Sequence, residues 1–208
     1  PIMLESQGVT SMLADRFGFE IPAKRKVLDD WKELADHVDT LDDAEEVHIA
    51  VAGKYTDLAD SYLSVIKALQ HASFKVNRKL VIDWIESSAL DGETEKSDSE
   101  SHNSAWELLR SADGILVPGG FGIRGIEGKI KAAEYARENK IPYLGVCLGL
   151  QVATIEFCRN VLGMEGANST EFDEEPAHAA VVFMPEISKT HMGGTMRLGT
   201  KPTPFLVD

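Results

Sequence analysis

The stretch Ile141-Pro142-Tyr143-Leu144-Gly145-Val146-Cys147-Leu148-Gly149-Leu150-Gln151 decides how this chain is interpreted. A short apolar run, typical of a buried strand, ends in Gly-Val-Cys-Leu-Gly, and Leu148, Val152 and Ile155 follow at helical spacing. Glycines flanking a thiol at a strand-to-helix junction are typical of a nucleophile elbow, because they permit a turn too tight for side chains. A cysteine is more often a small core residue, but packing alone does not explain the paired glycines. We therefore expect Cys147 to be a nucleophile.

Composition bounds the class of protein. The 208 residues, 43% of them hydrophobic, suit one sizeable domain with an appendage. A net charge of −13 argues against nucleic acid as a main partner, and without an apolar run of about 18 residues no membrane helix is expected. Cys147 and Cys158, placed on one helix, would lie about 16 Å apart, beyond disulfide reach. This favours a reducing, cytoplasmic setting, and no metal site is expected.

The chain divides into an appendage, residues 1–46, and a domain, residues 47–208. Helical patterns cover 7–17 and 28–38 of the appendage, and the acidic segment 36–46 is expected to be a solvated linker. The sequence begins at Pro1 without methionine and ends in an apolar run, Phe205-Leu206-Val207-Asp208. We therefore expect it to be a segment of a longer protein.

Strands and helices alternate along the domain. Buried strands are predicted at 47–53, 79–85, 114–118 and from 141, and helices at 57–72, 104–110 and 125–139. The Ser/Glu/Asp-rich segment 91–100 is predicted to be a solvated, mobile loop. The alternation predicts an α/β fold: a three-layer sandwich with a mostly parallel central sheet and helices on both faces. Ligands of such a sheet bind beyond the carboxyl ends of its strands.

Pro118-Gly119-Gly120-Phe121-Gly122 follows the third predicted strand directly. Paired glycines at a strand end allow backbone N–H groups to point at a ligand, and with the N–H of Leu148 they could form an oxyanion hole. An ordinary glycine-rich turn is the alternative for this segment taken alone. A Walker-type phosphate loop is a poor fit, because no Gly-Lys-Ser/Thr follows.

These motifs together resemble the class I (triad) glutamine amidotransferase domain, and in particular that of the CTP synthase family. Ala52-Gly53-Lys54-Tyr55, Asp60-Ser61-Tyr62 and the segments 121–129, 167–172 and 192–199 carry the closer resemblance, which covers nearly the whole chain. The resemblance implies a flavodoxin-like sandwich. It also implies that residues 1–46 are the end of a synthetase domain and the interdomain linker.

The resemblance implies a glutaminase reaction. Cys147 would attack the carboxamide of L-glutamine, with the backbone N–H groups of Gly120 and Leu148 stabilising the oxyanion. The residues that it implies for glutamine binding are Gly119, Gly120, Phe121, Gln151 and Glu171. From the residues alone, Glu171 would be one more charge in an acidic patch.

The resemblance also implies roles outside this domain. The ammonia would pass to a synthetase domain that uses ATP and Mg to convert UTP into CTP, in an enzyme assembled as a homotetramer. GTP would activate it, with Arg124, Gly125 and Glu127 in the coupling segment and the 192–199 loop near the interdomain passage. Plainer interpretations are a surface ion pair for Arg124 and a hairpin turn for the loop. No cofactor is implied for the domain itself.

One family feature is absent from the sequence. A triad nucleophile needs a histidine and an acidic partner, which the family supplies as a late His-Pro-Glu, and neither His178 nor His191 lies in such a motif. As written, the chain is expected to turn glutamine over little, if at all. Two alternatives therefore stay open: a non-catalytic docking or regulatory module of the same fold, and a relative of the intracellular protease and deglycase superfamily.

Overall fold

The computed structural model describes residues 2–21, 26–54, 56 and 59–183. Its strands are β1 Glu46–Gly53, β2 Lys79–Glu86, β3 Gly114–Val117, β4 Tyr143–Gly145, β5 Ala167–Ser169 and β6 His178–Val181. Its α-helices are α1 Ile2–Ser6, α2 Val9–Phe17, α3 Lys26–Thr40, α4 Leu63–Val76, α5 Gly92–Ser97, α6 Ser99–Ser111, α7 Ile126–Asn139 and α8 Leu148–Asn160. Short 3-10 helices are η1 Leu41–Asp43, η2 Ala59–Tyr62 and η3 Ser87–Leu90.

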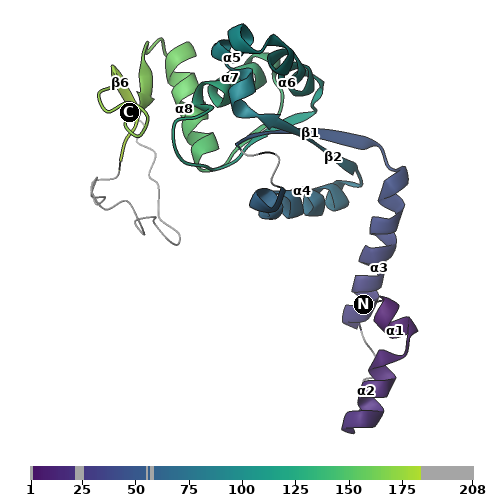
Figure 1. Ribbon diagram of the computed structural model, residues 1–208. Coiled ribbons are helices and arrows are strands. Elements are labelled where there is room, and N and C mark those ends of the chain that lie inside the picture. Colours follow the sequence, from purple (N-terminus) through teal and green to yellow (C-terminus); the bar gives the residue numbers. More distant parts are fainter. Residues whose placement is uncertain (1, 22–25, 55, 57–58, 184–208) are drawn as a thin grey trace.

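The central sheet is parallel throughout, in the order β2-β1-β3-β4. Val51 at its centre lies opposite Trp84 on β2 and Leu116 on β3. Helix α4 covers one face of the sheet, and α5 to α8 lie over the other (Figure 1). The predicted α/β sandwich is confirmed, and all strand carboxyl ends meet at one edge of the sheet, as the topology rule requires.

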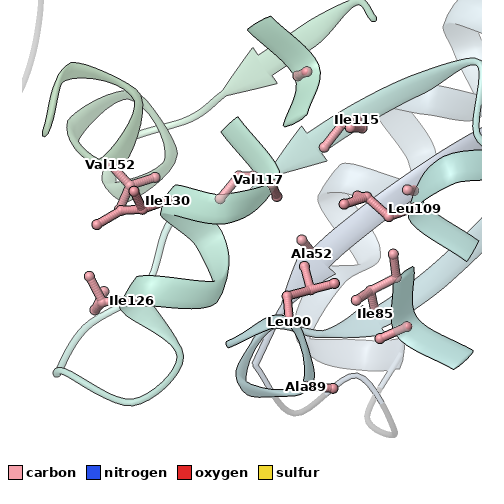
Figure 2. Close-up of a cluster of buried hydrophobic side chains, with 14 of the residues drawn as sticks. Ala52, Ile85, Ala89, Leu90, Leu109, Ile115, Val117, Ile126, Ile130 and Val152 are labelled. Atoms are coloured by element: carbon pink, nitrogen blue, oxygen red, sulfur yellow. The ribbon is translucent and has the colours of Figure 1, made fainter. Parts of the chain in front are cut away.

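The main core lies between the sheet and the helices α6, α7 and α8 (Figure 2). Ala52, Ile85, Ile115 and Val117 face it from the strands, and each is at most 2% exposed. Its other labelled members come from the 3-10 helix and the α-helices: Ala89, Leu90, Leu109, Ile126, Ile130 and Val152. The predicted inward residues Leu148, Val152 and Ile155 are all buried, so α8 packs against the sheet along the predicted face.

The segment 91–100 is largely exposed, as its composition predicts, but it is helical and not a loop. It forms α5 and the first turn of α6, each begun by an aspartate whose carboxylate caps the helix. Asp91 accepts hydrogen bonds from the N–H groups of Glu93 and Thr94 at 3.0 Å, and Asp98 accepts one from Ser101 at 3.1 Å. Capping of this kind stabilises a polar helix without apolar burial.

The acidic segment 36–46, predicted to be a solvated linker, is mostly helical and mostly exposed. Helix α3 continues to Thr40, η1 follows, and β1 begins at Glu46. The segment is anchored to the domain, because the carbonyl oxygen of Phe74 on α4 lies 2.8 Å from Nε2 of His37. Helices α1 to α3 extend away from the sheet (Figure 1).

Strand β4 is shorter and less buried than predicted. It has three residues, and Leu144 is 56% exposed. Within the described part of the chain it forms the edge of the sheet, and an apolar groove on the face covered by α4 reaches it. None of the helices in the described part of the chain is long and apolar enough to span a membrane.

Candidate functional site

Cys147 stands at the junction of β4 and α8, in the conformation expected of a nucleophile elbow. Its backbone has φ 53° and ψ −108°, a region that L-residues other than glycine rarely adopt. The side chain is exposed, and the thiol is free. Strained backbone of this kind persists where the surrounding structure enforces it, and it is typical of functional sites.

Close approach of neighbouring backbone requires glycine at both positions that flank Cys147. A Cβ atom on Gly149 would lie 2.0 Å from the carbonyl oxygen of Val117, and one on Gly145 would lie 2.5 Å from the carbonyl group of Gly149. The N–H of Val146 donates to the same Val117 carbonyl at 3.0 Å. The first turn of α8 therefore rests directly on the end of β3, and only glycine fits at both positions.

Tyr143 stabilises the first turn of α8. Its hydroxyl donates a hydrogen bond of 2.8 Å to the carbonyl oxygen of Gly149. Burial raises the pKa of the Tyr143 hydroxyl, with a smaller contribution from the carboxylate of Glu156. The phenol therefore remains a neutral donor across the physiological range.

The glycine loop after β3 lies against the elbow, as the sequence predicts. A Cβ atom on Gly119 would lie 3.3 Å from Cβ and 3.8 Å from Sγ of Cys147, and one on Gly120 would lie 3.6 Å from a methyl of Leu148. Within the described residues, the N–H groups of Gly119, Gly120, Phe121 and Leu148 have no hydrogen-bond acceptor. Unpaired N–H groups beside an exposed thiol are the donors that an oxyanion requires.

The two remaining candidates for glutamine contact lie on different elements. Gln151 is half-buried one turn along α8, where its N–H bonds the Cys147 carbonyl at 3.1 Å. Glu171 is exposed in the turn after β5, a strand that packs against α8. Among the described residues, no hydrogen bond joins Glu171 to Cys147, and the N–H of Glu171 bonds the hydroxyl of Ser169 at 3.1 Å. Burial lowers the pKa of Lys54, and the carboxylate of Glu171 has a smaller effect in the opposite direction.

Arg124, Gly125 and Glu127 each have a structural partner. Arg124 pairs with Glu86 at 3.2 Å, and Glu127 pairs with Arg159 at 2.9 Å. Gly125 has φ +71°, and a Cβ atom there would lie 2.3 Å from the hydroxyl of Ser87. The plainer interpretation of Arg124, a surface ion pair, therefore has direct support, and a coupling role stays a prediction.

No histidine of the described residues is hydrogen-bonded to Cys147. His37, His48 and His102 are each bonded elsewhere, and His178 is exposed on β6. His191 and the 192–199 loop lie outside the described residues. The same part of the chain contains no His, Cys, Asp and Glu group suited to a metal ion.

Two buried lysines near the glycine loop escaped the sequence analysis. Lys54 directly follows β1 and is 7% exposed, and Lys129 on α7 is 1% exposed. The Nζ of Lys129 lies 3.7 Å from the position of a Cβ on Gly120, and no described residue accepts a hydrogen bond from it. Burial, with repulsion from Lys54, lowers the pKa of Lys129 to about 8, while Glu86 acts in the opposite direction.

Known proteins resemble this chain in sequence over most of its length. The family model for Glutamine amidotransferase class-I matches residues 57–208. A CTP synthase of Eremothecium gossypii is 60% identical over 185 residues, which is 88% of this chain and 32% of that protein. CTP synthase 1 of Homo sapiens is 51% identical over 206 residues, 99% of this chain and 34% of that protein. The chain thus spans about a third of the length of these curated relatives.

A solved structure shows the same fold. The glutaminase domain of Trypanosoma brucei CTPS with bound acivicin superposes with a TM-score of 0.61 and 43% sequence identity. The match covers 69% of this chain and 53% of that one.

Proposed function

Because the chain belongs to the class I glutamine amidotransferase family, we propose that it is the glutaminase part of a CTP synthase. The observation that carries the proposal is the exposed thiol of Cys147 on a strained elbow, beside a loop whose N–H groups are unpaired within the described residues. Its relatives, CTP synthases at 50–60% identity, supply the reaction class.

The proposed reaction proceeds through a thioester. The thiolate of Cys147 attacks the carboxamide carbon of L-glutamine, and the resulting oxyanion accepts hydrogen bonds from the N–H groups of Gly120 and Leu148. Collapse of this intermediate breaks the carbon–nitrogen bond, and the leaving nitrogen takes up a proton and departs as ammonia. Water then attacks the thioester, which releases glutamate and regenerates the thiol. The α8 N-terminus favours both anionic species through its dipole.

Substrate binding is assigned to groups around the thiol. The backbone of Gly119, Gly120 and Phe121 would contact one side of glutamine and Gln151 the other. The carboxylate of Glu171 would hold the α-ammonium group, for which its negative charge is suited. A base and an acidic partner for the thiol are not found among the described residues, so proton transfer is left to groups elsewhere in the protein.

The proposal extends to the whole protein. Residues 1–46 would be the end of a synthetase domain and the linker that follows it. Ammonia would reach that synthetase domain and there displace the phosphate that ATP and Mg place on UTP. GTP would activate glutamine use through Arg124, Gly125 and Glu127, whose ion pairs and tight turn couple the glycine loop to β2 and α8. We further propose a homotetramer in the cytoplasm.

Labelling of Cys147 tests the proposal. In the full-length protein, the thiolate of Cys147 should displace the chloride of acivicin, so that the adduct mass on Cys147 is that of acivicin less HCl; excess L-glutamine should block the labelling, and Cys158→Ala should leave it unchanged. Labelling that glutamine does not block would favour a thiol enzyme of another class. An absence of labelling would favour a non-catalytic module.

Activity separates the two half-reactions. Cys147→Ala in the full-length protein should abolish CTP formation from glutamine and spare CTP formation from added ammonia. Loss of both activities would contradict the role assigned to the thiol.

A further inference from the structure

The ammonium group of Lys54 is bound to the backbone of the glycine loop. Its Nζ donates hydrogen bonds of 2.8 Å to the carbonyl oxygens of Phe121 and of Gly122. Lysine is seldom buried unless its charge is paired, and here both bonded partners are neutral carbonyls of one loop. Burial, followed by repulsion from Arg124, lowers the pKa of Lys54, while Glu86 and Glu171 act in the opposite direction.

Lys54 is itself held in place from the opposite side. Its N–H donates to the hydroxyl of Tyr62 at 2.9 Å, and the same hydroxyl donates to the carbonyl oxygen of Lys54. Gly53 makes the approach possible, because a Cβ atom there would lie 2.7 Å from that hydroxyl. The Tyr62 ring packs on Trp84 of β2, with ring centroids 5.4 Å apart. Gly53, Lys54 and Tyr62 therefore form one hydrogen-bonded unit, the Lys54–Tyr62 brace.

The bonds to Lys54 orient the loop. With the carbonyls of Phe121 and Gly122 turned towards Lys54, the chain direction is fixed immediately after Gly120, the residue that faces Leu148 and the elbow. Lys54 therefore anchors the loop directly after Gly119 and Gly120, the two residues that lie against Cys147 and Leu148.

We propose that Lys54 is a positioning residue of the glutaminase reaction, which fixes the oxyanion-binding loop through its carbonyls without contacting the substrate. This inference rests on the function proposed above. Loss of one oxyanion donor slows related reactions by about 10²–10³, and a misplacement of about 1 Å costs about 10². Removal of the ammonium group should therefore slow steps that need the oxyanion site by about a hundredfold.

Two electrophiles distinguish positioning from general damage. Acivicin must occupy the glutamine site before it reacts, whereas iodoacetamide needs only an accessible thiol. In full-length protein carrying Cys158→Ala, Lys54→Met should slow labelling of Cys147 by acivicin about a hundredfold, because the loop beside the thiol loses the two hydrogen bonds from Lys54. Alkylation by iodoacetamide should change by less than about twofold, because the elbow is built by other contacts.

Further variants sharpen the comparison. Tyr62→Phe loosens the brace and should slow acivicin in the same direction by a smaller factor. Lys54→Arg retains a cationic donor and should recover part of the rate. Lys67→Met removes an exposed lysine of α4 and should leave both rates unchanged. Amide hydrogen exchange in a peptide spanning 118–124 should accelerate in Lys54→Met and stay as in the parent protein in Lys67→Met.

Each failure has its own signature. If the parent protein is not labelled by acivicin, the proposed function is wrong. If it is labelled and Lys54→Met is labelled at the same rate, or if both electrophiles slow equally in that variant, the positioning role is wrong while the proposed function stands.

Discussion

Replacing Lys129 with methionine should stabilise the domain at neutral pH. The Lys129 side chain is 1% exposed on α7, and no described residue accepts a hydrogen bond from its ammonium group. A buried charge without a partner opposes folding. Methionine has nearly the same length, and its flexible thioether adapts to irregular space in a core.

The pKa of Lys129 gives the size of the gain. Burial, followed by repulsion from Lys54, lowers this pKa from its ordinary 10.5 to about 8. Since one pKa unit corresponds to about 1.4 kcal/mol, the penalty at neutral pH is about 3 kcal/mol. Repacking around the thioether costs less than about 1.5 kcal/mol, so Lys129→Met should raise the free energy of unfolding by about 2 kcal/mol at pH 7.

The gain should depend on pH with a definite sign. Between pH 8 and about 10.5, the unfolded lysine keeps its proton while the folded one has lost it, so the parent protein becomes more stable as pH rises. The methionine variant lacks this titration, and its advantage should shrink over the same range.

Denaturant unfolding followed by tryptophan fluorescence, from pH 7 to 10, measures the difference. Lys131→Met is the matched control, because Lys131 lies exposed on the same helix and pairs with Glu134 at 2.7 Å. Its effect should stay within about 0.5 kcal/mol. A Lys129→Met variant less stable than the parent at pH 7, or an advantage independent of pH, would refute the reasoning.

Three smaller predictions follow from other contacts. Gly149→Ala places a Cβ atom 2.0 Å from a backbone oxygen and should cost about 3 kcal/mol or more, whereas Gly92→Ala, with no atom within 4 Å, should shift thermal unfolding little; equal shifts would show that the elbow tolerates a side chain. Asp98→Ala removes the cap of α6 and should lower the unfolding free energy by about 1 kcal/mol, and an unchanged value would mean that the helix does not depend on its cap. The hydrogen bond to Asp83 raises the pKa of His48, so its stabilising effect should be complete below pH 6.5 and lost as pH rises through the raised pKa; an Asp83→Asn variant whose deficit does not shrink with pH would contradict this.

The parallel sheet was predictable because its strands are short apolar runs bounded by glycine or by polar turns. The predicted strands 47–53 and 79–85 differ from β1 and β2 by one residue at one end each. The segment 91–100 was not predictable from composition, because two side-chain caps outweigh the lack of apolar residues there. Helix capping is a local sequence signal, and Asp91 followed by Glu93 and Thr94 could have indicated the start of a helix.

The elbow was also predictable, since glycines four residues apart around a thiol leave few structural explanations. The two buried lysines were missed because lysine is normally solvated. A signal for Lys129 was nevertheless present: it stands three residues after Ile126 and one before Ile130, both buried, and so falls on the inner face of α7. For Lys54 the signal was its place at the carboxyl end of a central strand, where ligand-binding residues gather.

The contacts that set the elbow involve no side-chain atom of residue 147. The carbonyl of Val117, the absence of side chains at Gly145 and Gly149, and the hydroxyl of Tyr143 together decide where the thiol stands. The backbone that positions the thiol therefore does not depend on the thiol itself. A lineage that exchanged Cys147 for another small residue would change or lose its chemistry in one step and keep its fold, so this architecture is well suited to give rise to inactive copies that retain only the shape of the enzyme.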